Sequence, residues 1–195
     1  MTKPPLKFNI SNEELNSLPL GMFTGKVVVI QETAQIKKIL PELYDREALG
    51  FDTETKPVFV RGHSNKVALL QLALPEKVFL IRLQQTGVPD ELAEFLESAT
   101  IEKAGVAIRD DLVALKRLRS FSPAGFVELT HLTKAAGLEV ESVKKLTGLL
   151  LGFRISKSAQ TSNWEAPTLT EKQIQYAATD AWVCLEIFKK LRALR

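Results

Sequence analysis

Two apolar runs that follow each other almost directly constrain the fold more than any other feature of this sequence. The segments KVALLQLAL (66–74) and KVFLIRL (77–83) are separated only by Pro75 and Glu76. Each run has the length and apolar content of a β-strand, and so short a connection suits antiparallel neighbours, because parallel strands need a long crossover. The sequence therefore predicts an antiparallel β-hairpin.

Strand and helix signals alternate on both sides of this hairpin. Apolar, β-branched runs indicate strands, and segments with apolar residues at every third or fourth position indicate helices. The alternation is typical of βα units, so the sheet is expected to mix parallel and antiparallel strands. We predict an α/β fold in which a mixed five-stranded sheet is flanked by helices. Besides the hairpin, strands are expected at 26–31, 48–54 and 103–108, and helices at 33–43, 89–98 and 110–118.

The C-terminal half is expected to be mainly helical. Segments 128–137 and 140–152 each end in a glycine, which commonly terminates a helix. The last helix has a capping-box start over residues 170–173, followed by an apolar stripe that should pack on the sheet. That stripe comprises Ala177, Ala181, Cys184, Phe188 and Leu191.

The length of 195 residues fits one domain, which we place at 25–195. Residues 1–24 contain several Pro and Asn residues, so we expect an N-terminal arm that packs late or stays loose. The start of the chain lacks the apolar run of a signal peptide, and no apolar segment reaches the roughly 20 residues that span a bilayer. A membrane is therefore not an expected partner.

Overall charge does not select a function for this chain. The 26 basic residues are nearly balanced by 23 acidic ones, and a net charge of +3 is too small to indicate nucleic-acid binding. The single cysteine, Cys184, excludes an intrachain disulfide, and with two histidines the chain offers no spacing typical of a zinc site. A cytoplasmic location, where thiols stay reduced, is expected.

The first candidate site residues lie where the strand at 48–54 ends. Asp52 and Glu54 are two positions apart, so both side chains point to the same face of a strand. Two converging carboxylates repel each other unless a cation lies between them, and Mg²⁺ and Mn²⁺ prefer oxygen ligands. Alone, the pair is better explained by a strand that emerges into water.

Two further features add acids to this pair. The strand at 103–108 leads to Asp110 and Asp111 at a helix start, where Asp110 is best explained as a helix cap and Asp111 as the site candidate. In the last helix, Tyr176 and Asp180 lie one turn apart. A tyrosine in a helix usually serves packing and a lone aspartate is usually solvated. Neither interpretation explains why all three features occur at the ends of elements expected to share one sheet edge.

With these residues the sequence resembles the DnaQ-like 3′-to-5′ exonuclease superfamily in its tyrosine subclass, which has four acids and a Tyr-x-x-x-Asp motif. The histidine subclass would need a histidine where this chain has Gln175. Within the superfamily, the chain is most similar to Werner-type and ribonuclease D-type domains, from about Val27 to Arg192. This resemblance implies a ribonuclease H-like fold. It rests on the segments DTETKP, KVALLQLAL, KAGVAIRDDL, FVELTHL, SNW and LTEKQIQYAATDA, which occur in this order.

The resemblance also implies roles for individual residues. Two divalent cations, Mg²⁺ or Mn²⁺, would be bound by four acids, and Tyr176 would orient the attacking water. The backbone around Thr53 and the side chain of Glu54 would meet the terminal 3′-OH. Trp164 would stack on a base or wedge against it, although a tryptophan in such a position is as often a hydrophobic anchor. The four metal ligands would be Asp52, Glu54, Asp111 and Asp180.

The implied function is a 3′-to-5′ exonuclease that releases nucleoside monophosphates from nucleic-acid 3′ ends by two-metal-ion phosphodiester hydrolysis. Its partner would be a nucleic acid with a single-stranded or recessed 3′ end, with DNA favoured on the Werner-type similarity. One alternative is an RNA 3′-end processing exoribonuclease. Another is a catalytically inactive nucleic-acid-binding module, although the presence of all four acids and the tyrosine argues against it. A nucleotide-binding βα protein is not supported, because Gly105 and Gly125 fit no phosphate-loop spacing.

Overall fold

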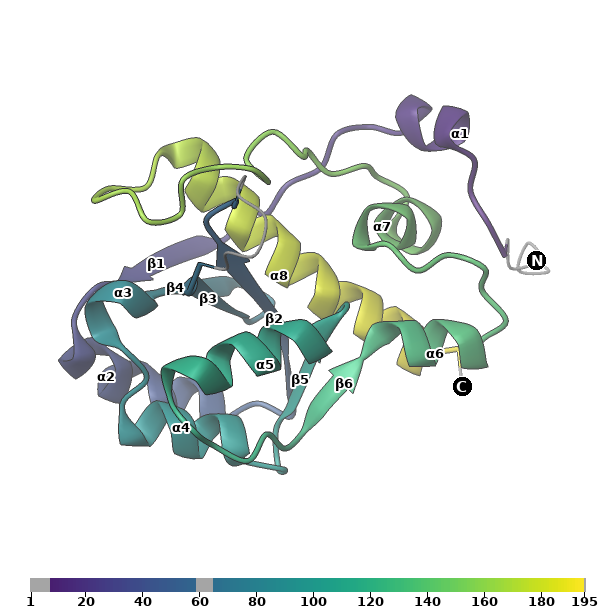
Figure 1. Ribbon diagram of the computed structural model, residues 1–195. Helices are drawn as coiled ribbons and strands as arrows, with labels where there is room; N and C mark the ends of the chain where they lie inside the picture. The colour runs from purple at the N-terminus through teal and green to yellow at the C-terminus, as the bar shows by residue number, and fades with distance from the viewer. Residues whose placement is uncertain (1–7, 59–64, 195) are drawn as a thin grey trace.

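A mixed six-stranded sheet forms the centre of the computed structural model, which describes residues 8–58 and 65–194 (Figure 1). The strand order is β1-β4-β3-β2-β5-β6. Strands β2, β3 and β4 are antiparallel to their neighbours within this trio, whereas β1, β5 and β6 add to the sheet in parallel. The strands are β1 (Lys26–Ile30), β2 (Ala48–Thr55), β3 (Val67–Ala73), β4 (Lys77–Arg82), β5 (Glu102–Gly105) and β6 (Phe126–Glu128).

The predicted hairpin is present as β3 and β4, and every residue of β3 is buried. The sheet has one strand more than expected, because β6 pairs with β5 at the edge. Three residues are too few to show an alternation of apolar and polar positions, so no sequence pattern indicates this strand.

Helices cover both faces of the sheet (Figure 1). On one face, α2, α4 and α5 enclose the larger apolar core together with Phe51 and Leu72. On the opposite face, α8 crosses β2, β3, β4 and β5, and α7 packs beside it. None of the helices within the described residues is long and apolar enough to cross a membrane. The helices are α1 (Asn12–Ser17), α2 (Thr33–Tyr44), α3 (Leu83–Thr86), α4 (Asp90–Glu97), α5 (Ile108–Leu118), α6 (Leu129–Ala135), α7 (Val143–Leu151) and α8 (Glu171–Arg192).

The start of α8 confirms the predicted capping box. The hydroxyl of Thr170 accepts a hydrogen bond from the amide of Gln173 at 3.3 Å, and the Gln173 side chain accepts one from the amide of Thr170 at 3.0 Å. The predicted apolar stripe of α8 is buried along its whole length. Because the cap sets where the helix begins, it also sets the positions of the polar residues in its first three turns.

Close backbone contact between α8 and β2 brings the two elements of the site together. A β-carbon added to Gly50 would lie 1.9 Å from the carbonyl oxygen of Ala181, so only glycine fits at this crossing. Asp52 is two positions after Gly50 and points to the same face of β2. Asp180 precedes Ala181, so the crossing places the two acids side by side.

The described part of the N-terminal segment, residues 8–24, is packed against the rest of the fold. Leu15 of α1 is buried on α7, and Phe23 is buried on α8. The side-chain amide of Gln175 donates to the carbonyl of Phe23 at 2.6 Å, and the guanidinium of Arg154 donates to the carbonyl of Leu18 at 3.1 Å. We had expected an arm that packs late or stays loose; residues 8–24 make specific contacts instead, and residues 1–7 lie outside the described part.

Candidate active site

Three carboxylates converge where α8 crosses the end of β2. Asp52 and Glu54 project from one face of β2, and Asp180 projects toward them from α8. One carboxylate oxygen from each residue lies within 4.8 Å of the corresponding oxygens of the other two. The strand spacing noted in the sequence therefore produces a cluster, and the helix supplies its third member.

The electrostatics of this cluster oppose full ionisation. Burial raises the pKa of Asp52 well above its ordinary value, and the charges of Asp180 and Asp111 raise it further. Burial likewise raises the pKa of Glu54 to about 10, with Asp52 as the next cause. Carboxylates this close can all be ionised at neutral pH only when positive charge compensates them.

Asp180 has a buried carboxylate oxygen that a cation could bind. Burial raises its pKa to about 6, while a hydrogen bond from Tyr176 and the charge of Lys157 oppose that rise. Its Oδ1 atom is buried and has no hydrogen-bond partner. Buried carboxylate oxygens are normally satisfied, and a divalent cation shared with Asp52 and Glu54 would satisfy this one. The all-oxygen donor set fits a hard cation such as Mg²⁺ or Mn²⁺.

Tyr176 lies one turn before Asp180 on α8 and is half-buried. Burial raises the pKa of its phenol far above the ordinary value, and the charges of Asp180 and Glu54 raise it further. The phenol is therefore protonated at any physiological pH. It can donate a hydrogen bond or accept one through its oxygen, but it does not act as a base.

Asp111 approaches the cluster from the other side of β2. Its Oδ1 accepts a 2.5 Å hydrogen bond from the hydroxyl of Thr53. Burial raises its pKa to about 6, and the Thr53 hydrogen bond partly offsets that rise. Asp111 lies outside the three-carboxylate cluster, yet its charge raises the pKa values of Asp52 and Glu54. The structure thus brings all four predicted acids into one electrostatic unit, in which Asp111 is held separately.

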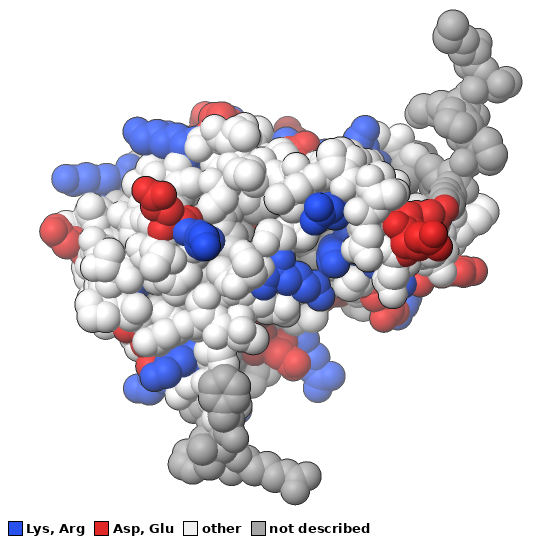
Figure 2. All heavy atoms as spheres, turned by 90° about the horizontal axis from the view of Figure 1, so that it is seen from above, with Lys and Arg blue, Asp and Glu red and all other residues white. Residues whose placement is uncertain are grey.

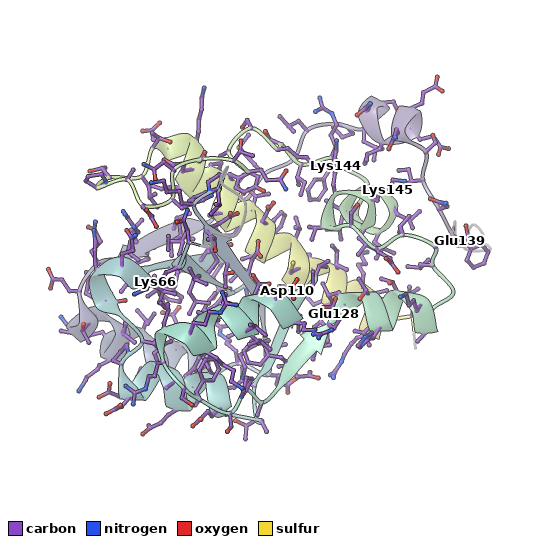
Figure 3. The ribbon with its side chains drawn as sticks, viewed as in Figure 1. Lys66, Asp110, Glu128, Glu139, Lys144 and Lys145 are labelled. Atoms are coloured by element: carbon purple, nitrogen blue, oxygen red, sulfur yellow. The ribbon has the colours of Figure 1, made fainter. Side chains whose placement is uncertain are left out.

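Glu128 is a residue that the sequence did not single out. Its Oε2 accepts a 3.1 Å hydrogen bond from the amide of Ile108 at the start of α5, and its Oε1 accepts one from the amide of Thr130 in α6. Figure 3 shows Glu128 and Asp110 near the start of α5. One carboxylate therefore stabilises the first turns of two helices, one of which holds Asp111.

This arrangement corrects the expectation that Asp110 caps its helix. The helix α5 begins at Ile108, and Ala107 precedes it in a left-handed conformation with φ of 58°. Ala107 is the N-cap residue, and its side chain makes no capping hydrogen bond. Asp110 is therefore inside the first turn and exposed. No local sequence signal could have identified Glu128 as the actual partner, because it is 20 residues further along the chain.

The sequence left two roles open for Trp164, stacking on the substrate or anchoring a loop in the core. In the structure it is a buried anchor. Its side chain is 0% exposed, and its ring centroid lies 6.0 Å from that of Tyr176. An enclosed indole offers no face to a nucleobase, so the expected stacking or wedging against substrate does not fit this structure. Instead, Trp164 supports Tyr176 from behind within the apolar cluster under α8.

The chain belongs to the 3′-5′ exonuclease family, whose family model matches residues 27–194. This match includes every acid described above and Tyr176, and members of the family depend on divalent metal ions. The assignment confirms both the superfamily resemblance and the ribonuclease H-like fold expected from the sequence.

Individual relatives agree with this assignment. The chain is 36% identical over 186 residues to the mouse bifunctional 3′-5′ exonuclease/ATP-dependent helicase WRN, covering 90% of this chain and 13% of that protein. It resembles the crystal structure of the Aedes aegypti Nibbler EXO domain with a TM-score of 0.78 at 25% identity, covering 89% of this chain and 92% of that one. It also resembles an EXD2 exonuclease domain soaked in Mn, with a TM-score of 0.51 at 31% identity and coverages of 86% and 89%. The chain thus spans about an eighth of the length of WRN and nearly all of the two solved exonuclease domains.

Proposed function

We propose that this chain hydrolyses phosphodiester bonds at the 3′ end of a nucleic acid and releases nucleoside monophosphates. The observation that carries the proposal is the convergence of Asp52, Glu54 and Asp180 within 4.8 Å, with Tyr176 one turn from Asp180. A chain of the 3′-5′ exonuclease family that keeps this set has the groups needed for metal-assisted hydrolysis.

The acids are assigned as ligands of two divalent cations, Mg²⁺ or Mn²⁺. Bound there, the cations would neutralise charge on the phosphate and lower the pKa of the attacking water. By the family resemblance, Asp52 would be a ligand of both cations; it lies in the three-carboxylate cluster, and the charge of Asp111 also acts on it. Glu54 and Asp180 then belong to the first cation and Asp111 to the second.

Tyr176 orients the attacking water in this proposal. Its phenol is neutral and lies next to Asp180, so it contributes geometry and not proton abstraction. The backbone around Thr53 and the side chain of Glu54 meet the terminal 3′-OH, which accounts for attack from a free end. The Thr53 hydroxyl has a separate task, because it holds Asp111. Trp164 is left out of the substrate contacts because it is buried.

The proposed substrate is a nucleic acid with a single-stranded or recessed 3′ end. DNA is favoured on the Werner-type similarity, and an RNA 3′-end processing exoribonuclease is the second candidate. The 36% identity to WRN supports an exonuclease role only, since the chain covers 13% of that protein. A cytoplasmic location stays a prediction.

The test is incubation with DNA and RNA oligonucleotides labelled at either end, in Mg²⁺, Mn²⁺ or EDTA. We expect metal-dependent release of mononucleotides from the 3′ end, and we expect Asp52→Asn to abolish it. Asp110→Asn is the matched control, because Asp110 is exposed and outside the cluster. Activity that persists in EDTA, or cutting only inside the strand, would disprove the proposal.

A further inference from the structure

A pocket adjoins the carboxylate cluster on the side of α7. It has a volume of about 250 Å³ and lies between the first turn of α7, the segment 155–160 and α8. Tyr176 and Asp180 form one wall, so anything bound in the pocket lies directly beside the cluster. Small-molecule sites usually measure roughly 300 to 1,000 Å³, so this pocket suits a fragment of a larger ligand.

The charge of this pocket favours an anion. Lys144 and Lys157 line it, and neither forms an ion pair with any residue that the structure describes. The charge of Lys157 also acts on Asp180 across the pocket. Basic side chains gather near the middle of the face shown in Figure 2.

The pocket is distinct from the place where the reacting phosphate would lie. Asp52 and Glu54, two of the three acids of the cluster, do not line it, and neither does Asp111. A phosphate held by the cluster is therefore outside the pocket. Because Asp180 belongs to both, the pocket begins where the cluster ends. A strand with its 3′ end in the cluster has a second phosphate one nucleotide away.

We propose that Lys144 and Lys157 hold this neighbouring backbone phosphate, one nucleotide upstream of the bond that is cut. The inference rests on the proposed exonuclease function. It adds a part of the site that binds a nucleic-acid strand and that a single nucleotide would not reach. Lysine is a point charge that binds phosphate without reading the base, so the contact fixes the register of the strand and is independent of sequence.

Two substrates separate this pocket from the cluster. The p-nitrophenyl ester of thymidine 5′-monophosphate contains only the phosphate that is cut, whereas a DNA trinucleotide also has the upstream one. For Lys144→Ala/Lys157→Ala, we expect the ratio of kcat/KM for the trinucleotide to kcat/KM for the ester to fall about tenfold. Lys145→Ala is the matched control, because Lys145 is the neighbouring residue on α7 and does not line the pocket. Figure 3 shows Lys144 and Lys145 on α7.

A binding measurement makes the inference independent of turnover. For a phosphorothioate DNA strand, which resists cleavage, the double variant should raise Kd about tenfold, and the slope of log K against log salt should fall by about 0.7. Lys157→Arg should restore most of the affinity. The inference is overturned if the double variant matches Lys145→Ala in both measurements, or if ester hydrolysis falls as much as trinucleotide hydrolysis. If the wild-type protein binds the strand through these lysines but cuts neither substrate, the pocket stands and the proposed hydrolysis fails.

Discussion

At the scale of single residues, the raised carboxyl pKa values link the site to the stability of the protein. The pKa of Glu54 rises from 4.5 to about 10 on folding, and that of Asp111 from 3.8 to about 6. Between the unfolded and folded values, the folded protein binds more protons than the unfolded chain. Stability from these groups is therefore fully present below about pH 4 and is lost as the pH rises toward 10.

The resulting prediction concerns pH and metal together. In EDTA, Tm should fall as the pH rises from 5 to 8.5, because the folded protein keeps the Glu54 proton that the unfolded chain has released. Mn²⁺ should raise Tm, and by more at high pH, since the cation binds the ionised carboxylates. Differential scanning fluorimetry over this pH range, with and without Mn²⁺, measures both trends. Glu54→Gln should flatten the EDTA profile. A Mn²⁺ effect of the same size at every pH would contradict the prediction.

The second prediction at this scale separates the two neighbouring aspartates. Asp111→Asn removes the charge of a proposed metal ligand beside the cluster and weakens the contact with Thr53, so kcat on an oligonucleotide should nearly vanish. Asp110→Asn removes an exposed charge from the first turn of α5, which costs about 0.3 to 1 kcal/mol of stability through the helix dipole. Steady-state kinetics and thermal denaturation of both variants give the comparison. The reverse result would move the proposed metal-ligand role from Asp111 to Asp110.

The sequence could predict these acids because each depends on local geometry. Asp52 and Glu54 share a strand face, and Tyr176 and Asp180 share a helix face, so spacing alone brings the members of each pair together. Glu128 depends on a different kind of geometry. It caps a helix whose first residue precedes it by 20 positions, and only the parallel pairing of β5 with β6 brings them together. Trp164 shows the same limit, since its burial depends on the path of a whole loop.

At the scale of elements, the crossing of α8 over β2 sets the distance between the acids. Gly50 leaves no room for a β-carbon beneath Ala181, and the nearest atom is backbone, which cannot rotate away. The helix period predicts the stripe that packs here, but no pattern indicates how closely the two backbones approach. The three-residue β6 was not predicted either, because so short a strand shows no alternation of apolar and polar residues.

Gly50→Ala should therefore move α8 away from β2 and separate Asp180 from Asp52. We expect a loss of about 1 to 3 kcal/mol of stability from overpacking, together with a large fall in kcat. Gly21→Ala is a matched control, because the three atoms nearest to its added β-carbon belong to the side chain of Phe153. Urea denaturation and oligonucleotide turnover should show a smaller effect for the control on both measures. Equal activity of Gly50→Ala and wild type would show that the cluster tolerates a displaced helix.

At the scale of the whole molecule, the N-terminal segment completes the packing of α7 and α8. Ile10, Leu15 and Phe23 are buried there, although the sequence around them is interrupted by polar and proline residues. Sequence patterns could not predict this packing because the segment lacks a sustained period. Its partners belong to elements more than 100 residues away, such as Gln175 for Phe23.

A chain shortened to begin at Gly25 tests this role. Burial of three large apolar side chains contributes about 1.5 to 3 kcal/mol each, so their loss removes roughly 5 to 9 kcal/mol. Since a whole domain is stable by about 5 to 15 kcal/mol, the shortened chain should be marginally folded or unfolded at 25 °C. A chain beginning at Phe8 keeps all three contacts and should match the 195-residue chain in its Tm and its circular dichroism spectrum. If the chain from Gly25 also had the same Tm and spectrum, residues 8–24 would not contribute to stability. The packing of α7 and α8 on the sheet would then suffice to position Asp180 and Tyr176.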